Sequence, residues 1–135
     1  MQRPSTRPRT TVFATLAAAF ALAGCGGAGE AHGAGGADVP SAFAKCQACH
    51  SLEPGRHGIG PSLAGVHGSP AAHVGDYAYS SAMRQAGRDG LVWDAEALDA
   101  YLANPRAVVP GTSMSFAGLR DEAARAELVE WLEGV

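Results

Sequence analysis

Two cysteines and a histidine stand together at Cys46, Cys49 and His50, in the segment CQACH. Thiols three residues apart lie on the same side of a helical turn, where both can add to the two vinyl groups along one edge of a porphyrin. The adjacent histidine is then carried beneath the ring as an axial ligand of its iron. The spacing C-x-x-C-H is the attachment signature of c-type haem, so we predict one covalent haem c at these residues.

Two other chemistries use a pair of cysteines at this spacing. A redox pair of the thioredoxin kind needs a βαβ setting, and no strand pattern surrounds residues 46–50. A zinc site needs another Cys or His pair at finger spacing, and Cys49 is the last cysteine of the chain. The motif and its helical setting therefore favour haem over both alternatives.

The first 24 residues have the features of an export signal. Three arginines stand within the first nine residues, no acidic residue precedes Glu30, and an apolar run over residues 12–23 is broken only by Thr15. A run of this length suits a signal h-region and is too short to span a bilayer as a helix. We therefore predict that residues 1–24 are a signal peptide. Export suits haem attachment, since bacterial c-type haem is attached outside the cytoplasm.

Leu22-Ala23-Gly24-Cys25, at the end of that run, resembles the lipobox of bacterial lipoproteins. Cys25 would then be the lipidated first residue of the mature protein, tethered to the periplasmic side of a membrane. The alternative is an ordinary signal peptidase site, with Ala21 and Ala23 as its small residues, which leaves a soluble periplasmic protein with a free thiol. An exposed unpaired thiol is a liability in an oxidising compartment. We favour lipidation, which gives all three cysteines a role.

Removal of residues 1–24 makes the mature chain more acidic. It takes away three of the ten basic residues and none of the thirteen acidic ones, which moves the formal net charge from −3 to −6. Such a surface argues against binding nucleic acid and against electrostatic adhesion to anionic lipid. Residues 26–37 contain six glycines and no large apolar side chain. We therefore predict a flexible linker over 25–37 and one folded domain over 38–135.

The domain is predicted to be all-α, because no segment alternates convincingly as a strand. A first helix is expected to begin near Asp38, with Asp38 or Ser41 as its N-cap, and to carry Phe43 into the haem motif. Residues 51–75 are rich in Gly, Pro and Ser and lack periodicity, so we predict a long loop there. A haem would supply the apolar surface on which such a loop can pack.

Three more helices are predicted towards the C-terminus. A short one extends from residue 80 to about residue 86. Asp94 is expected to cap a helix over 95–103, which Asn104-Pro105 ends. Asp121 is expected to start the last helix, where apolar residues recur at helical spacings of three and four. These apolar residues are Leu128, Trp131 and Leu132.

Residues 38–135 resemble the class I cytochromes c, in particular their mitochondrial-like bacterial members. The likeness rests on short motifs that occur in the same order along the chain. They are CQACH at 46–50, GPSLAGVHG at 60–68, YSSAM at 79–83, GLVW at 90–93, YLANP at 101–105, VPGTSMSFAGL at 109–119 and ELVEWL at 127–132. The resemblance implies a fold of three main helices, with short helices and long loops, wrapped around one covalent haem.

The resemblance also assigns roles to individual residues. Met114 matches the sixth iron ligand, opposite His50, and Pro61 matches the residue whose carbonyl accepts the ring N–H of that histidine. Tyr79 and Trp93 match side chains whose polar hydrogens bind a haem propionate. Four further residues match the apolar walls around the haem: Leu63, Leu98, Phe116 and Leu128.

The sulfur ligand can also be argued from the residues themselves. A thioether is a soft ligand, and Pro110-Gly111 marks a turn that can aim Met114 inward. Tyr101 matches the tyrosine that lies beside this sulfur in the family. The commoner fate of a methionine is to fill a core, which is the alternative for Met114. Met83, the other methionine of the mature chain, lies in a helix-like segment without such a turn.

The chain departs from the family in four respects. Val39 stands where a glycine usually lets the first helix cross the last one closely, so the crossing is looser or the helix begins later. Ser69 replaces an arginine near a propionate, which removes one neutralising charge. Met83 replaces an asparagine near the haem. Lys45 is the only lysine of the mature chain, so the lysine ring by which the mitochondrial proteins dock is almost absent.

These features predict an electron carrier rather than an enzyme, with a low-spin iron held by His50 and Met114 at a fairly high potential. The expected partners of this monomer are a quinol-oxidising complex, a terminal oxidase, a reaction centre or a dehydrogenase. The alternatives are a haem peroxidase or gas-binding protein with an open sixth site, and an electron-entry subunit of a periplasmic dehydrogenase. His57, His67 and His73 lie in loops and could serve as ligands, but a loop histidine is more often simply solvated, which is the interpretation we favour.

Overall fold

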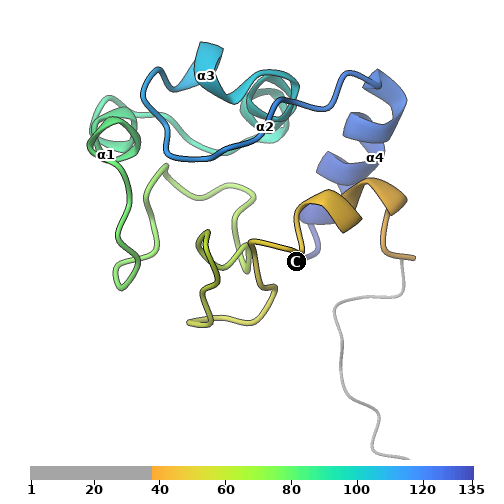
Figure 1. The fold of residues 1–135 in the computed structure, drawn as a ribbon, viewed down its shortest axis with the longest axis horizontal. Coiled ribbons are helices and arrows are strands. Elements are labelled where there is room, and N and C mark those ends of the chain that lie inside the picture. The colour runs from red at the N-terminus through yellow and green to blue at the C-terminus, as the bar shows by residue number, and fades with distance from the viewer. Residues whose placement is uncertain (1–37) are drawn as a thin grey trace, which may run out of the picture. The chain divides into compact units, whose positions relative to one another are not determined.

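The computed structural model describes residues 38–135; the predicted signal peptide, Cys25 and the predicted linker lie outside the described residues. The elements in order are a 3-10 helix η1 (Ser41–Lys45), α1 (Ser81–Arg88), α2 (Ala95–Ala103), α3 (Pro105–Val108) and α4 (Glu122–Leu132) (Figure 1). This part of the chain contains no strand, only an isolated antiparallel bridge between Pro70 and Val92. None of its helices is long and apolar enough to cross a membrane. The all-α prediction is confirmed.

Side-chain caps fix where the longer helices begin. Asp94 accepts a hydrogen bond from the amide of Ala97 at the start of α2, and Asp121 accepts one from Ala124 at the start of α4. Ser80 caps α1 in the same way. Each cap satisfies an N–H that has no partner within the helix and contributes about 1 kcal/mol. The predicted helix starts at Asp94 and Asp121 are confirmed.

The helical predictions need two corrections. The first helix is a short 3-10 helix with Pro40 at its N-cap position and no side-chain cap, so neither Asp38 nor Ser41 caps it. It begins beyond Val39, which is 59% exposed. Because Val39 replaces the family's glycine, we expected either a looser crossing of the first and last helices or a first helix that begins later, and the helix does begin later. The second correction is α3, which the sequence pattern did not predict. Asn104 ends α2 and also caps α3, with a proline at the first helical position.

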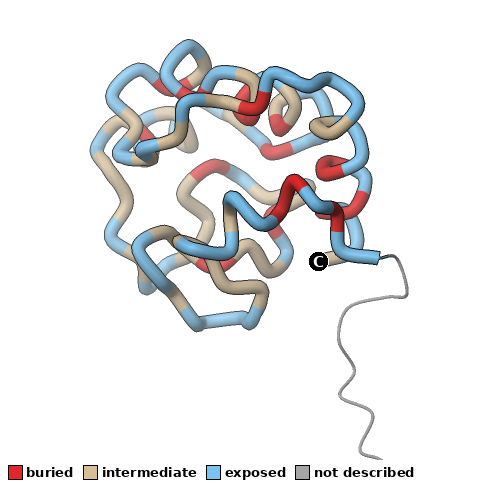
Figure 2. Tube along the Cα trace, turned by 45° about the vertical axis from the view of Figure 1, so that its right-hand side comes forward, coloured by how far each residue is buried: buried red, intermediate tan, exposed pale blue. Residues whose placement is uncertain are grey.

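Helix α4 packs against both η1 and α2, and these three helices hold one side of the core (Figure 1). Phe43 of η1 contacts Trp131 of α4 with ring centroids 4.8 Å apart, and Leu128 of α4 is only 1% exposed. Gly118 allows the chain before α4 to approach α2, because a Cβ on it would overlap the carbonyl oxygen of Ala103. Figure 2 shows the buried positions on the sides of these elements that face one another.

Residues 51–80 form a long loop without helix or strand, as predicted for most of this range. Backbone hydrogen bonds fix its course. The amide of Leu63 donates to the carbonyl of Ser51 at 2.9 Å, and the amide of Ala71 donates to the carbonyl of Leu91 at 2.8 Å. The first bond closes the loop on its own first residue, and the second ties it to the segment before α2. A third bond, from the amide of Gly60 to the carbonyl of Cys49 at 2.9 Å, ties the loop to the CQACH segment. The loop is thereby held as one wall of the site.

Candidate haem site

One cavity of about 250 Å³ lies between the long loop, η1, α1, α2, α4 and the segment before α4. Every residue of the described part that was predicted to serve the haem lines it: Cys46, Cys49, His50, Pro61, Tyr79, Trp93, Tyr101 and Met114. The four predicted wall residues line it too: Leu63, Leu98, Phe116 and Leu128. The fold therefore brings the two thiols, the histidine, the methionine and the apolar walls to one place.

The imidazole of His50 is held by a hydrogen bond. Its Nδ1 lies 2.7 Å from the carbonyl oxygen of Pro61. Because a carbonyl can only accept, Nδ1 must carry the proton. This fixes the tautomer, and Nε2 keeps its lone pair for a metal. The bond is the one that the resemblance implied for Pro61.

Two glycines let the loop pack closely on the CQACH segment. A Cβ on Gly60 would lie 2.8 Å from both ring nitrogens of His50 and nearer still to its Cε1. A Cβ on Gly58 would lie 2.5 Å from the carbonyl oxygen of Cys49. Neither position has room for a larger residue unless the ring or the backbone moves, since protein interiors are close-packed. These glycines therefore help to set the position of the imidazole.

We expect Gly60→Ala to disturb the His50 site, because the added methyl group overlaps the imidazole that Pro61 holds. Overpacking of this kind costs about 1–3 kcal/mol. Thermal unfolding of the haem-loaded protein, together with its ferric absorption spectrum, measures the effect. Gly75→Ala is the matched control, since nothing lies within 4 Å of a Cβ at that position. Equal stability of the two variants would contradict the role of close packing at Gly60.

Cys46 and Cys49 are free, partly exposed thiols. The amide of His50 donates to the carbonyl of Cys46 at 2.9 Å, which makes this segment a single helical turn. Burial raises the pKa of the Cys46 thiol, and the neighbouring Cys49 raises it further, whereas the reactive thiols of redox pairs have lowered pKa values. Within residues 38–135 no group of three or more His, Cys, Asp or Glu side chains could hold a metal ion. The redox-pair and zinc interpretations are thus disfavoured.

Met114 follows a turn that Tyr101 stabilises. Gly111 has a φ of 90°, a left-handed conformation that glycine adopts readily. The hydroxyl of Thr112 lies 2.8 Å from the hydroxyl of Tyr101 and accepts a hydrogen bond from the amide of Met114 at 3.3 Å. Met83 of α1 also lines the cavity and is 8% exposed. The cavity therefore offers two thioethers, one after a turn and one on a helix.

Tyr79, Trp93 and Tyr101 bring aromatic surface and polar hydrogens into the cavity. The rings of Trp93 and Tyr101 are 4.8 Å apart, and both residues are buried. Burial raises the pKa of both phenols, Tyr79 and Tyr101, so both stay protonated at neutral pH and can donate hydrogen bonds. The flat apolar rings suit the porphyrin macrocycle. The O–H and N–H groups can donate hydrogen bonds to its propionate carboxylates, so these three residues fit a haem.

Two of the three loop histidines, His57 and His73, are not simply solvated, which corrects the sequence-based interpretation for these two. His57 is 17% exposed, and its Nε2 lies 3.0 Å from a carboxylate oxygen of Asp76, while its Nδ1 accepts a hydrogen bond from the amide of Ser62. His67 is 31% exposed. Both ring nitrogens of His73 are closed to solvent, and this residue lines the cavity. The position of these histidines in a loop could not reveal their burial or their hydrogen bonds, because the residues that pack around them come from other parts of the chain.

The most direct evidence for the family is sequence identity. The chain is 43% identical over 99 residues to cytochrome c2 iso-2 of Magnetospirillum fulvum, an alignment that covers 73% of this chain and 100% of that protein. It belongs to the class I cytochromes c. The chain is also 43% identical to cytochrome c2 of Rhodomicrobium vannielii, over 67% of this chain and 70% of the relative. No family model matches the sequence.

Solved structures of class I cytochromes c have the same fold. Cytochrome cH from Methylobacterium extorquens is 40% identical and superposes with a TM-score of 0.62, covering 68% of this chain and 90% of that chain. Cytochrome c2 from Rhodospirillum centenum is 33% identical with a TM-score of 0.63, covering 67% and 89%. This class I cytochrome c is an electron-transfer protein and not an enzyme, and it carries one covalent haem c.

Proposed function

We propose that the protein is a one-electron carrier in which His50 and Met114 ligate a low-spin haem iron from opposite sides. The observation that carries the proposal is the 2.7 Å hydrogen bond from His50 Nδ1–H to Pro61, which leaves Nε2 of a cavity-lining imidazole as the free ligand atom. When bound, the haem supplies a ferric–ferrous couple. Methionine ligation and burial both favour the ferrous state, so we expect a fairly high reduction potential.

The chain's own contribution is to hold the two ligands in the same place in both oxidation states. His50 is fixed by the Pro61 bond and by the close approach of Gly60. The backbone of Met114 is fixed through the hydroxyl of Thr112. Ligands that are already in position need little reorganisation when charge changes. The apolar walls exclude water and lower the local dielectric constant, which strengthens every charge effect at the site.

The backbone setting favours Met114 over Met83 as the sulfur ligand. Met114 lies in a segment without helix or strand, just after the turn at Gly111. Met83 lies in the first turn of α1, and its amide is the one that Ser80 caps. A buried methionine on a helix face is ordinary core filling. The Met114 side chain has no neighbouring helical turns in its own segment, which suits a ligand.

The ferric absorption spectrum of the full-length protein tests this ligand set. In this family a weak band at the red end of the visible range is the usual sign of iron–methionine bonding, and we expect that band here. Its absence would instead support an open sixth position, the property of peroxidases and gas-binding haem proteins. The same spectrum in the reduced state reports whether the iron stays low-spin.

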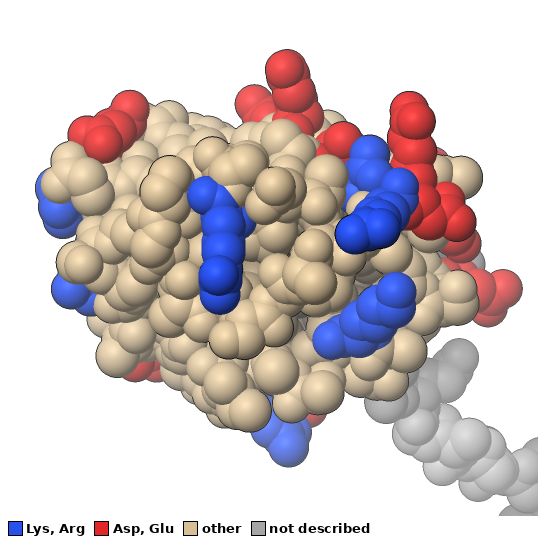
Figure 3. Space-filling model, turned by 45° about the horizontal axis from the view of Figure 1, so that its top comes forward, with Lys and Arg blue, Asp and Glu red and all other residues tan. Residues whose placement is uncertain are grey.

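The proposed partners are the complexes of a respiratory or photosynthetic chain: a quinol-oxidising complex, a terminal oxidase, a reaction centre or a dehydrogenase. Five basic residues are exposed and form no ion pair within residues 38–135: Lys45, Arg84, Arg88, Arg106 and Arg120. Figure 3 shows Lys and Arg side chains spaced over a broad uncharged face, with Asp and Glu side chains along its edges. Such a face suits local contacts between these basic side chains and acidic groups of a partner.

We further propose that lipid on Cys25 tethers the carrier to the periplasmic side of a membrane. The support is the lipobox-like sequence at residues 22–25. The linker after Cys25 would reach about 20 Å as a random coil and keep the haem domain near membrane partners at a raised effective concentration. The native protein should therefore partition with membranes and have no free N-terminal amine.

Intact-mass measurement of the native protein checks the anchor, and Cys25→Ser is expected to block lipoprotein processing. Replacing the leader with an ordinary secretory signal should give a soluble carrier with the same haem spectrum and potential, because the described residues that line the haem cavity all lie between Phe43 and Leu132. A mature N-terminus elsewhere, or a Cys25 without diacylglycerol, would leave a freely diffusing periplasmic cytochrome.

A further inference from the structure

Met114 lies in a segment whose backbone has no backbone partner. Within residues 38–135, no amide or carbonyl of residues 113–118, the Met114 segment, bonds to another backbone group. The amide of Met114 has only the hydroxyl of Thr112, at 3.3 Å. Half-buried positions alternate with exposed ones along the segment, so one side of it faces the protein and the other faces solvent. The position of Met114 therefore depends on what holds the two ends of the segment.

Both ends of the Met114 segment are held to α2. At the first end, the hydroxyl of Thr112 lies 2.8 Å from the hydroxyl of Tyr101. At the second end, the amide of Leu119 donates to the carbonyl of Leu102 at 2.8 Å, and Leu119 is buried. These two bonds attach the segment to neighbouring residues of one helix.

Arg125 of α4 reinforces the second end. Its Nε and Nη2 lie 2.8 and 3.4 Å from the two carboxylate oxygens of Asp99 on α2. Its Nη1 donates to the carbonyls of Leu119 and Arg120 at 2.9 and 3.2 Å. The planar guanidinium has donors in a fixed fork, so one side chain can make all four bonds at once. This set of bonds, the Arg125 junction, joins α2, α4 and the end of the Met114 segment.

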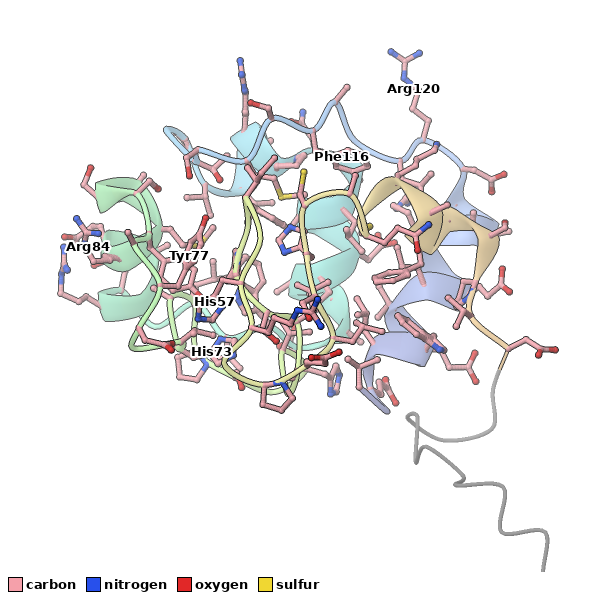
Figure 4. The ribbon with its side chains drawn as sticks, turned by 60° about the horizontal axis from the view of Figure 1, so that its bottom comes forward. His57, His73, Tyr77, Arg84, Phe116 and Arg120 are labelled. Atoms are coloured by element: carbon pink, nitrogen blue, oxygen red, sulfur yellow. The ribbon has the colours of Figure 1, made fainter. Side chains whose placement is uncertain are left out.

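Burial distinguishes the Arg125 junction from a surface ion pair. The side chain of Arg125 is 12% exposed and that of Asp99 is 43% exposed, whereas Arg56 and Glu53 form a pair with 69% and 67% exposed side chains. Exposed pairs contribute little because water competes for both charges, and hydrogen bonds are stronger where water is excluded. Figure 4 shows the side chain of Arg120 pointing away from the protein, so the junction uses only the backbone of that residue.

We propose that Arg125 is a positioning residue for Met114, because it fixes the end of the Met114 segment to α2 and α4 and so keeps the sulfur on the iron. The proposal rests on the proposed function, since it requires Met114 to be the sixth ligand. Arg125 does not line the cavity, so it acts through the backbone of the segment and not on the haem. The sulfur can leave the iron only when the segment moves away from the cavity, and the junction resists this motion at Leu119.

Imidazole binding to the ferric full-length protein tests the proposal. Imidazole can reach the iron only when the sulfur is off it, so its apparent affinity scales with the fraction of molecules in which the segment is open. Arg125→Lys keeps the charge but cannot make the forked set of bonds. Because hydrogen bonds to charged groups are among the stronger ones, we expect imidazole to bind this variant about tenfold more tightly than the wild type. Asp99→Asn leaves the two carbonyl bonds in place and should give a smaller gain.

Arg56→Lys is the matched control, because it is the same substitution in an exposed ion pair of the long loop. Its imidazole affinity should equal that of the wild type. Circular dichroism during thermal unfolding reports whether the helices of each variant are folded under the conditions of the titration. Asp99→Asn leaves the arginine in place, so it carries the test if Arg125→Lys does not fold.

A second background separates positioning from a general loss of stability. In Met114→Ala the sulfur is absent, so no ligand bond remains for the Arg125 junction to protect. Adding Arg125→Lys to this variant should leave the imidazole affinity unchanged to within about twofold. A purely structural role would instead change imidazole binding equally with and without Met114.

Wild-type imidazole affinity in Arg125→Lys would overturn the proposal, and so would an equal gain in the Met114→Ala background. If Arg125→Lys does not fold, wild-type affinity in Asp99→Asn overturns it. A gain in Arg125→Lys without one in Asp99→Asn would support the proposal and place the effect in the two carbonyl bonds. Failure of the proposed function shows separately, as a wild-type ferric spectrum without the red band and an imidazole affinity that Met114→Ala does not change.

Discussion

Replacing both thiols, Cys46→Ser together with Cys49→Ser, is expected to give a chain that releases all of its haem and does not fold. The thioether bonds cannot form without the sulfurs. Without haem, buried residues such as Leu98, Tyr101 and Leu128 each lose a packing partner, because all three line the cavity. The net stability of a domain is only about 5–15 kcal/mol, so we expect this loss to exceed it.

Acid–acetone extraction of the purified double variant and of the wild type measures the first effect, and circular dichroism measures the second. Cys25→Ser is the matched control: it removes a thiol outside the CQACH segment, and its haem should stay with the protein through extraction. Haem that stays with the double variant through the same extraction would show that the attachment is not through these thiols.

The parts of the fold that depend on local chemistry could be predicted from the sequence. Asp94 and Asp121 cap helices because a short carboxylate can reach an amide three residues on, and nothing distant is needed for that bond. The haem attachment site could be predicted for the same reason, because it depends on two thiols and a histidine that are close together in the sequence. α3 was missed because Asn104-Pro105 was treated only as the end of a helix, although asparagine followed by proline also suits the start of one.

The parts that depend on packing could not be predicted in the same way. His73 stands in a stretch of sequence without periodicity, and its ring nitrogens are buried in a loop that Ala71 joins to the segment before α2 and to α1. The same holds for His57, whose partners Ser62 and Asp76 lie 5 and 19 residues further along the chain. When a loop wraps around a cofactor, its buried side chains pack against the cofactor rather than against a helix or a sheet. Its buried residues therefore show no helical or strand pattern.

Met114→Ala is expected to remove the red ferric band, to make the iron high-spin or misligated, and to lower the reduction potential. Methionine sulfur stabilises ferrous iron, so its loss stabilises the ferric state. Axial ligands change haem potentials over about 0.8 V, and we expect a decrease of about 0.2 V. An open sixth position should also give the variant peroxidase activity and binding of added ligands. Spectroelectrochemistry and a peroxidase assay measure these effects.

Met83→Leu provides the matched control within the same cavity, because leucine keeps most of the volume of methionine and removes only the sulfur. Met114→Leu removes the other sulfur in the same way. The two methionines both line the cavity, so a difference between these variants reports ligation rather than packing. If Met114→Leu kept the band and the potential while Met83→Leu lost them, the ligand would be on α1. The turn at Gly111 and the Thr112–Tyr101 pair would then hold a wall of the cavity instead of a ligand.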